Sequence, residues 1–383
     1  MMRDRENALS QLLRRAAEAL DMPEHLHKEA VQKYGEVGQY LGDADSPLSI
    51  NFLEIYHQGS FRLGTINRPL TDKDEFDIDL VCHLQLKKQN ISQKELKQRV
   101  GDRLKQKEEY RRILTEGRRC WTLDFEDRFH MDVLPAIPDE EGRKDSILIT
   151  DRELTHWQHS DPKGYADWFL KRMPPLLFAE EREMLAKALQ VEIEEVPEWK
   201  VKTPLQRAVQ LLKRHRDLHF QHDRKDQPVS IIISTLAAWA YTGQADLYES
   251  LVHLAREMPV YIEKRNGVYW VANPVNPAEN FADKWQEYPQ RREKFFTWLK
   301  KVETDVTAAL DTQGIPGVTA VLGPSFGESI VAKAVQGLGN TAYQQREAGK
   351  LYISTGTGML AAAGPTIVKS HAFHGEVDET ENN

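Results

Sequence analysis

Cysteine is scarce in this chain, which has only Cys82 and Cys120 among its 383 residues. Two cysteines build neither a disulfide framework nor a cysteine zinc site, and they fit a reducing compartment, so we expect a cytoplasmic protein. Long apolar runs are missing as well. The longest, residues 231–241, is interrupted by Ser234 and Thr235 and is too short to cross a bilayer, so we expect no membrane span.

An excess of basic residues is also missing, because 51 Lys and Arg are outnumbered by 59 Asp and Glu and the net charge is −8. A general nucleic-acid binder would have a strongly basic face, so strong nucleic-acid binding is not expected, while a local basic groove stays open. Residues 1–6 lead into an amphipathic pattern and not into an apolar signal core. With 40% hydrophobic and 29% charged residues, the composition indicates a globular protein of about two domains.

The most informative stretch is residues 58–80. It begins with a small-residue turn, Gln58-Gly59-Ser60, whose backbone N–H groups and hydroxyl suit phosphate oxygens. It ends with Asp77-Ile78-Asp79, and on a strand the two carboxylates project from the same face because side chains alternate. Adjacent carboxylates repel, so we expect a cation between them, and hard oxygen ligands favour Mg²⁺.

A third acid follows in residues 129–135, an apolar strand that carries Asp132 and ends at a proline. A two-metal site needs acids from more than one strand, so Asp132 is the natural third ligand. His130 shares the strand face of Asp132 and is expected to flank the site. Taken singly, the Gly-Ser pair is usually only a turn and the Asp-Ile-Asp triplet a solvated edge strand, so the prediction depends on their order and spacing.

Together these residues resemble the signature of the DNA polymerase β-like nucleotidyltransferase superfamily. The fuller strings at 58–65, 68–70 and 75–80 resemble bacterial CD-NTases, relatives of cGAS and oligoadenylate synthase that make cyclic oligonucleotides in CBASS anti-phage defence. The resemblance implies a bilobed α+β fold, with a nucleotidyltransferase core of mixed sheet and helices and an α-helical C-terminal lobe. It also implies synthesis of a cyclic di- or trinucleotide from ATP, GTP or other nucleoside triphosphates, with Mg²⁺ or, alternatively, Mn²⁺.

By the same resemblance, Asp77 and Asp79 bind both metal ions, and Asp132 binds the catalytic one and helps to activate the acceptor hydroxyl. Further residues are implied to bind the nucleotide or its triphosphate: Gln58, Gly59, Ser60, Lys213, Ser230 and Asn273.

The last three of these also have simpler interpretations. Lys213 ends an amphipathic helix and is an ordinary solvated cation if the resemblance does not extend to it. Ser230 opens an apolar helix and could serve as its N-cap. Asn273 begins Asn273-Pro274-Val275-Asn276-Pro277, which is stiff turn chemistry, and many relatives have Asp there, so base preference is not transferred.

The remaining patterns are mostly helical from residue 162 onward, with stripes that include 178–189, and a small hairpin is predicted around Gly267. The glycine-rich segments 314–317 and 323–327 lack a Walker lysine and are predicted as loops. The predicted divisions are 1–47 (N-terminal helices), 48–160 (nucleotidyltransferase core), 161–375 (helical lobe similar to oligoadenylate synthase) and 376–383 (disordered tail).

Two segments carry an open alternative. His215, His219 and His222 form either a zinc site or, as the lack of suitably spaced cysteines favours, a polar helix end. Residues 369–375 resemble a C-terminal element of some CD-NTases that contributes packing. The acidic tail, 376–383, is either an idle terminus or the attachment point for a ubiquitin-transfer-like or other CBASS regulatory protein, as in some operons of this family.

Rival functions share the same core motif. A linear oligonucleotide synthase, or an enzyme that adds a nucleotide to RNA or a small molecule, needs the same three acids. A catalytically dead nucleotide-binding scaffold is disfavoured because all three acids and the Gly-Ser turn are present.

Overall fold

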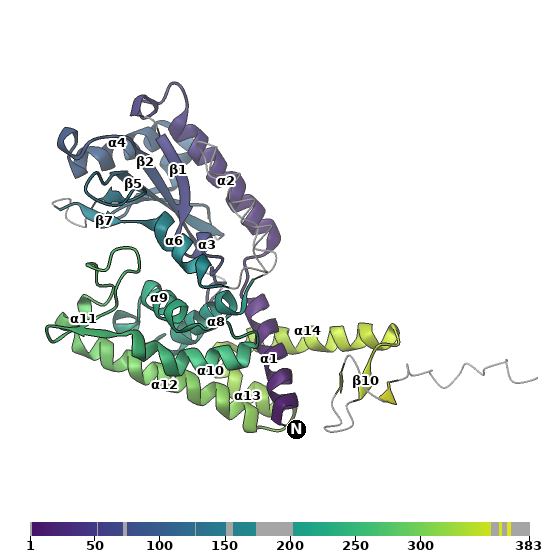
Figure 1. Cartoon of the computed structure of the whole chain (residues 1–383). Helices are drawn as coiled ribbons and strands as arrows, with labels where there is room; N and C mark the ends of the chain where they lie inside the picture. Colours follow the sequence, from purple (N-terminus) through teal and green to yellow (C-terminus); the bar gives the residue numbers. More distant parts are fainter. Residues whose placement is uncertain are drawn as a thin grey trace, which may run out of the picture.

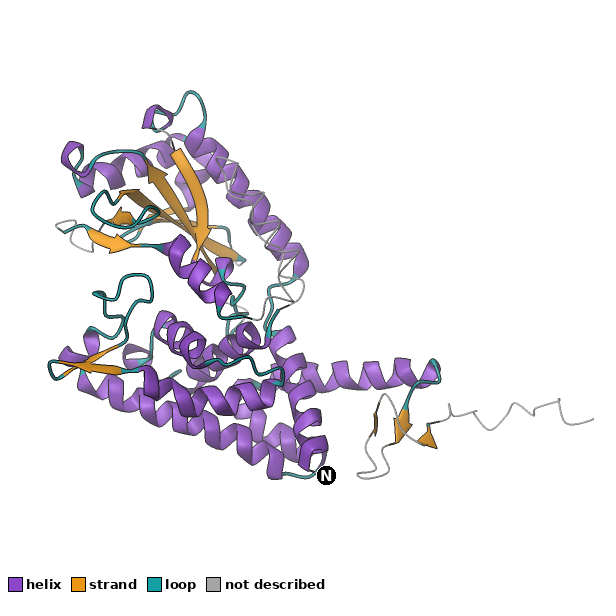
Figure 2. Ribbon diagram, in the orientation of Figure 1, coloured by secondary structure: helices purple, strands orange, loops and turns teal. Residues whose placement is uncertain are grey.

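The computed structural model describes residues 2–51, 53–71, 75–126, 128–150, 156–173, 202–353, 360–361 and 366–368. They form an α+β molecule with a lobe built on a β-sheet and a lobe built of helices (Figures 1 and 2), as predicted. The predicted helix at 178–189, the segment 369–375 and the tail 376–383 lie outside the described residues.

The sheet lobe is organised on a mixed sheet with the order β1-β2-β5-β4-β3. β2 and β5 pair in parallel, whereas β1–β2 and β4–β5 are antiparallel. β6 pairs with β5 and β7 pairs with β6. The strands are β1 (Leu53–Gln58), β2 (Phe76–Leu84), β3 (Leu114–Glu116), β4 (Trp121–Asp124), β5 (Phe129–Pro138), β6 (Ile147–Ile149) and β7 (Gln158–Ser160).

One face of this sheet is covered by helices α2 (Glu24–Gly42), α4 (Gln93–Gln106) and α5 (Glu108–Ile113). In α4, Leu96, Val100 and Leu104 recur every four residues and are all fully buried, as their helical spacing predicts. Ser92 and Glu95 form a capping box that fixes the start of α4. The alternation of the strands therefore leaves their acidic residues on the opposite face.

The helical lobe follows the sheet in the chain. Its helices are α6 (Pro162–Lys171), α8 (Pro204–His219), α9 (Ser230–Ala240), α10 (Leu247–Glu257), α11 (Lys284–Glu287), α12 (Pro289–Asp311), α13 (Gly314–Phe326) and α14 (Glu328–Glu347). β8 (Glu263–Arg265) and β9 (Val268–Trp270) form the hairpin predicted around Gly267. Short strands β10 (Tyr352–Ile353), β11 (Leu360–Ala361) and β12 (Thr366–Ile367) follow α14, which projects from the lobe (Figure 1).

The prediction of loops at 314–317 and 323–327 was wrong, because α13 covers nearly all of both segments. Tertiary packing outweighs the low helix propensity of glycine here. Leu322 and Phe326 of α13 are buried in the core of the lobe. A Cβ atom at Gly323 would lie 2.3 Å from Glu328 Oε2, so the glycine permits a close approach at the α13–α14 corner.

The two N-terminal helices pack against different lobes. α1 (Met2–Ala19) buries Leu13 and Ala17 in the core of the helical lobe and packs along α14, α10 and α8. α2 buries Tyr34 and Val37 against the sheet. Pro23 lies between α1, whose apolar stripe faces the helical core, and α2, whose apolar stripe faces the sheet. The N-terminal segment therefore connects the two lobes. The predicted domain boundaries stay predictions.

None of the helices in the described ranges is long and apolar enough to span a membrane.

Candidate active site

Gly59 brings the end of β1 against the acidic strand β2. Its φ is 63°, a left-handed conformation that glycine adopts easily. A Cβ atom at this position would lie 2.2 Å from Asp79 Oδ2, so no larger residue fits without a shift. Gln58 is the partner of Asp79 in the β1–β2 register, and Ser60 follows in the short helix α3 (Gly59–Arg62). The Gly-Ser turn therefore lies directly beside the carboxylates.

Three aspartates meet on the open face of the sheet. Asp77 and Asp79 project from the same face of β2, and Asp79 lies opposite Asp132 in the parallel β2–β5 register. One carboxylate oxygen from each of the three lies within 4.8 Å of the others. Among the described residues, this is the one group of acids, histidines or cysteines close enough to hold a metal ion. The predicted trio is therefore brought together by strand pairing.

Crowded negative charge dominates the electrostatics of this trio. Burial, together with repulsion from Asp77 and Asp132, raises the pKa of Asp79 well above its usual range, although His130 and Lys213 partly oppose the shift. Oxygen-only donors with excess negative charge fit a hard divalent cation, and Mg²⁺ is such a cation. The residues of the site therefore fit a metal ion of this kind.

His130 flanks the aspartates, as its place on the strand predicts. Its Nε2 lies 3.2 Å from Asp77 Oδ1, and its Nδ1 lies 3.6 Å from Glu75 Oε2. The hydrogen bond to Asp77 and the nearby charges of Asp77, Asp132 and Glu75 raise the pKa of His130 to about 9, against the opposing effect of burial. The imidazolium therefore supplies positive charge at the rim of the site.

Sequence reasoning missed two side chains of β4 and its preceding turn. Thr122 Oγ1 donates a hydrogen bond to Asp132 Oδ1 at 2.5 Å, and Cys120 Sγ lies 4.0 Å from the same hydroxyl. Burial raises the pKa of the Cys120 thiol to about 12, so this group stays neutral. The alternation of residues 121–124 could have predicted that Thr122 lies on the acidic face. It could not have predicted that Thr122 pairs with Asp132.

Lys213 reaches this region from the helical lobe. It is only 7% exposed, and its Nζ donates to the carbonyl oxygen of Thr65 at 2.9 Å. On the same helix, the side-chain amides of Gln206 and Gln210 donate to the carbonyls of Leu63 and Ile66. Burial lowers the pKa of Lys213 to about 8. α8 is thus hydrogen-bonded to the loop that follows the Gly-Ser turn. The predicted contact of Lys213 with the triphosphate stays a prediction.

Ser230 and Asn273 are engaged by neighbours inside the helical lobe. The N-cap of α9 is Val229, not Ser230. Ser230 Oγ instead accepts a hydrogen bond from Arg216 Nη1 at 2.9 Å. Asn273 is 5% exposed, donates from Nδ2 to Glu279 Oε2 at 2.7 Å, and accepts at Oδ1 from the Val275 N–H. These contacts stabilise the chain locally, and the predicted nucleotide contacts of both residues stay predictions.

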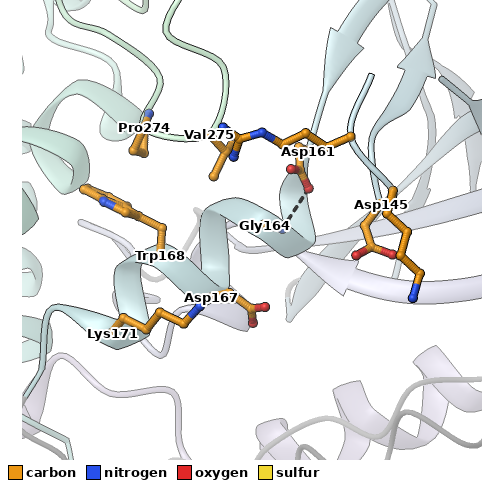
Figure 3. Close-up of a pocket in the computed structure, with 10 residues that line it drawn as sticks. Asp145, Asp161, Gly164, Asp167, Trp168, Lys171, Pro274 and Val275 are labelled. Carbon is orange, nitrogen blue, oxygen red and sulfur yellow. Dashed lines mark hydrogen bonds between the residues drawn. The ribbon is translucent and has the colours of Figure 1, made fainter. Parts of the chain in front are cut away.

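A cavity of about 340 Å³ lies apart from the aspartates, on the surface of α6 (Figure 3). Trp168 and Lys171 of α6 line it, together with residues 143–145 of the sheet lobe and Pro274 and Val275 of the loop after β9. None of the three aspartates is among its lining residues. The chemistry of the site therefore points to the sheet face, not to this cavity.

His215 of α8 lies in the helical core, so it belongs neither to a zinc site nor to the polar helix end that was the simpler interpretation. His215 is buried, its Nδ1 accepts from Trp298 Nε1 at 3.0 Å, and its Nε2 lies 3.1 Å from Asp305 Oδ2. Because Nδ1 is an acceptor, Nε2 is the protonated nitrogen. Both ring nitrogens are therefore occupied by protein partners, and neither is available to zinc.

Comparisons with known proteins agree with this geometry. Residues 8–172 match the Second Messenger Oligonucleotide or Dinucleotide Synthetase domain. The chain is 32% identical over 379 residues to a c-di-GMP synthase of Roseivirga ehrenbergii, a match that covers 97% of this chain and 99% of the relative. It is 25% identical to the cyclic dinucleotide synthase CdnG of Bradyrhizobium diazoefficiens, over 94% of this chain and 90% of the relative.

Solved structures show the same fold. The CD-NTase CdnG of Bradyrhizobium diazoefficiens, in complex with GTP, aligns with a TM-score of 0.71 at 23% identity and covers 87% of this chain and 99% of its own. The CdnC:HORMA-deltaN complex of E. coli aligns with a TM-score of 0.63 at 15% identity, over 83% of this chain and 96% of its own. At these identities the likeness concerns the fold alone.

Proposed function

Because the chain belongs to the bacterial CD-NTase family, we propose that it joins two molecules of GTP into a cyclic dinucleotide. As a member, it is a nucleotidyltransferase that makes a cyclic oligonucleotide second messenger from nucleoside triphosphates. The preference for guanine is the finer part of the proposal. This preference is based on the relative named a c-di-GMP synthase, which matches almost the whole chain. The complex of CdnG with GTP supports it.

Asp77, Asp79 and Asp132 are the residues that would hold Mg²⁺ in this reaction. Their oxygens lie within 4.8 Å of one another on the sheet, and their crowded negative charge favours a bound cation. Bound Mg²⁺ would supply Lewis-acid chemistry, lowering the pKa of the acceptor hydroxyl and neutralising charge on the phosphates. Asp132, from the neighbouring strand, is the carboxylate proposed to help remove the proton of that hydroxyl.

The triphosphate is proposed to lie along the Gly-Ser turn. Gly59 is an exposed residue beside Asp79 at the start of α3, and Gln58 and Ser60 flank it with polar side chains. Lys213 approaches the same turn from the other lobe through its bond to Thr65. Lys213 and the backbone donors on one side, and Mg²⁺ held by the carboxylates on the other, would orient the triphosphate for in-line attack. Ser230 and Asn273 are proposed to contact the nucleotide farther along the helical lobe.

The rival function is release of a linear oligonucleotide, which needs the same acids. The test incubates purified protein and Mg²⁺ with each labelled nucleoside triphosphate, singly and in pairs, and then with phosphatase. We expect a phosphatase-resistant product from GTP alone, because ring closure leaves no terminal phosphate. A product from which phosphatase removes a terminal phosphate would support the linear rival. A product that requires ATP would contradict the guanine preference.

The biological setting follows from the family. We infer a role in anti-phage defence in the cytoplasm. A regulatory protein acting on the C-terminal tail belongs to the same proposal. Phage plating on cells that carry the intact operon or the Asp77→Ala, Asp79→Ala variant would test this role. Equal plaque numbers on both strains would contradict it.

A further inference from the structure

The hydroxyl of Thr122 is hydrogen-bonded to Asp132 on the acidic face of the sheet. Thr122 lies directly opposite Asp132 in the antiparallel β4–β5 register, and its Oγ1 lies 2.5 Å from Asp132 Oδ1. We propose that Thr122 is a positioning residue that holds the Asp132 carboxylate in the orientation needed for metal binding. The inference rests on the metal site of the proposed function.

The direction of this hydrogen bond follows from the groups involved. An ionised carboxylate only accepts hydrogen bonds, so the hydroxyl of Thr122 is the donor. A distance of 2.5 Å is at the short end expected for a hydroxyl bound to a carboxylate, and such bonds are stronger than neutral ones. A bond to one carboxylate oxygen restricts rotation about the last side-chain torsion of Asp132. The acid is therefore presented to its neighbours in one orientation.

The backbone of Thr122 is anchored on both sides. Trp121 is 3% exposed, its indole N–H donates to the carbonyl of Lys97 at 2.8 Å, and its ring fills the space that a side chain at Gly101 would occupy. Leu123 is fully buried on the same side. Because side chains alternate, these two core residues force Thr122 onto the acidic face. The hydroxyl is thus carried by a rigid element, as precise positioning requires.

The side chain of each of the other two aspartates is also held by a neighbouring residue, so Thr122 plays the same part for Asp132. Asp77 contacts His130 Nε2 at 3.2 Å, and Asp79 is packed against the backbone of Gly59. Asp132 projects from a different strand and receives its restraint from β4. Partners that orient metal ligands typically change metal affinity or activity by about 10- to 100-fold when they are removed.

The competing explanation is that Thr122 only fills space between strands, as β-branched residues often do. The two explanations differ in what Val and Ser do at this position. Valine keeps the branched shape and loses the hydroxyl, whereas serine keeps the hydroxyl and loses the branch. Thr115 on β3 provides a matched control, because its hydroxyl contacts the carbonyl of Thr122 at 3.5 Å and is bonded to no acid.

The experiment compares the full-length wild type with Thr122→Val, Thr122→Ala, Thr122→Ser and Thr115→Val. Mn²⁺ binding is titrated by electron paramagnetic resonance, with the Asp77→Ala, Asp79→Ala variant as the blank. The Mg²⁺ concentration that gives half-maximal synthesis and the melting temperature are measured on the same samples. We expect Thr122→Val and Thr122→Ala to weaken Mn²⁺ binding and to raise the Mg²⁺ requirement by about tenfold or more. Thr122→Ser and Thr115→Val should resemble the wild type.

Three results would overturn the proposal. The first is a Thr122→Val protein with wild-type Mn²⁺ affinity, even if its activity falls. The second is a folded Thr122→Ser protein as weak as Thr122→Val, which would assign the effect to shape. The third is a wild type that binds no more Mn²⁺ than the blank, which would remove the metal site of the proposed function as well. If Thr122→Val is unstable, Thr122→Ala answers the same question without a buried methyl group.

Discussion

At the scale of single residues, Asp79 is the most restrained carboxylate of the site. It lies opposite Gln58 on one side and Asp132 on the other, and Gly59 leaves just enough space for it. Burial and repulsion from Asp77 and Asp132 raise its pKa well above the usual range. A site of this kind sacrifices stability for function, because like charges at close range destabilise the folded state.

Replacing Asp77 and Asp79 together with alanine should abolish synthesis. The free energy of unfolding without metal should stay the same or rise, because two of three repelling carboxylates are removed. Product formation and thermal unfolding in EDTA are the measurements. Asp124→Ala, an exposed acid at the end of β4, is the matched control and should keep activity. Synthesis at the wild-type rate by the double variant would contradict the metal assignment.

At the scale of elements, α6 is fixed to the sheet lobe by a small ionic cluster. Glu54 of β1 lies 3.3 Å from His83 Nδ1 and also pairs with Lys163 of α6. Lys163 lies over the ring of Tyr56, 4.4 Å from its centroid. α6 also buries Tyr165 and Phe169 in the core of the helical lobe. This helix therefore connects the two lobes on the far side of the sheet from α2.

The cluster predicts a specific loss of stability in acid. The hydrogen bond from His83, aided by Lys163 and opposed by burial, lowers the pKa of Glu54 to about 2. A glutamate in an unfolded chain titrates at about 4.3, so the stabilisation is present above that pH and disappears as the pH falls from about 4.3 towards 2. Since Glu54 is 34% exposed, we expect on the order of 1 kcal/mol after allowance for solvent screening.

Denaturant unfolding at pH 7 and at pH 3 measures this effect. Glu54→Gln should be less stable than the wild type at pH 7, and the difference should shrink at pH 3. Glu116→Gln, which changes a 58% exposed glutamate, is the control and should show no such convergence. An equal difference at both pH values would mean that the charge of Glu54 does not stabilise the fold.

At the scale of the whole molecule, α8 joins the helical lobe to the nucleotide-binding turn. The side chains of Gln206, Lys213 and Gln210 donate to three carbonyls of the loop at residues 63–66. Arg207 pairs with Asp21 just after α1. α1 in turn packs along α14 and α10. Movement of one lobe relative to the other must therefore act on the turn that is proposed to hold the triphosphate.

Lys213 makes this coupling measurable through pH. Its pKa, lowered to about 8 by burial, means that its charge is present at pH 7 and lost as the pH rises through 8. A bound triphosphate favours the charged form, so the KM for GTP of the wild type should rise above pH 8. Lys213→Met lacks the charge at every pH and should reduce kcat/KM on the order of 100-fold at pH 7.

The decisive measurement is the ratio of wild-type to Lys213→Met kcat/KM between pH 7 and 9.5. We expect this ratio to fall as the pH rises. Lys333→Met on α14, where the lysine is exposed, controls for the loss of one positive charge and should have little effect. Parallel pH profiles of the wild type and Lys213→Met would show that Lys213 does not contact the triphosphate.

Local patterns were sufficient to predict which acids of the site share a face, because the side chains of a strand point to the same face at every second residue. That period places Asp77 and Asp79 on one face whatever the rest of the chain does, and it places Asp132 and His130 together in the same way. The hairpin at Gly267 was predicted on equally local grounds. The resemblance of the Gly-Ser turn and the three acids to CD-NTases then indicated the family.

The tertiary structure alone decided how these pieces meet. Which strand lies beside which depends on long-range pairing, so the contacts of Asp79 with Asp132 and of Thr122 with Asp132 had no local signal. The bond from Lys213 to Thr65 joins residues 148 positions apart. Glycine-rich α13 is a helix because burial of Leu322 and Phe326 outweighs propensity. The short periods of strands and helices determine which side chains share a face of an element. Which elements lie beside one another is determined by the packing of the whole chain.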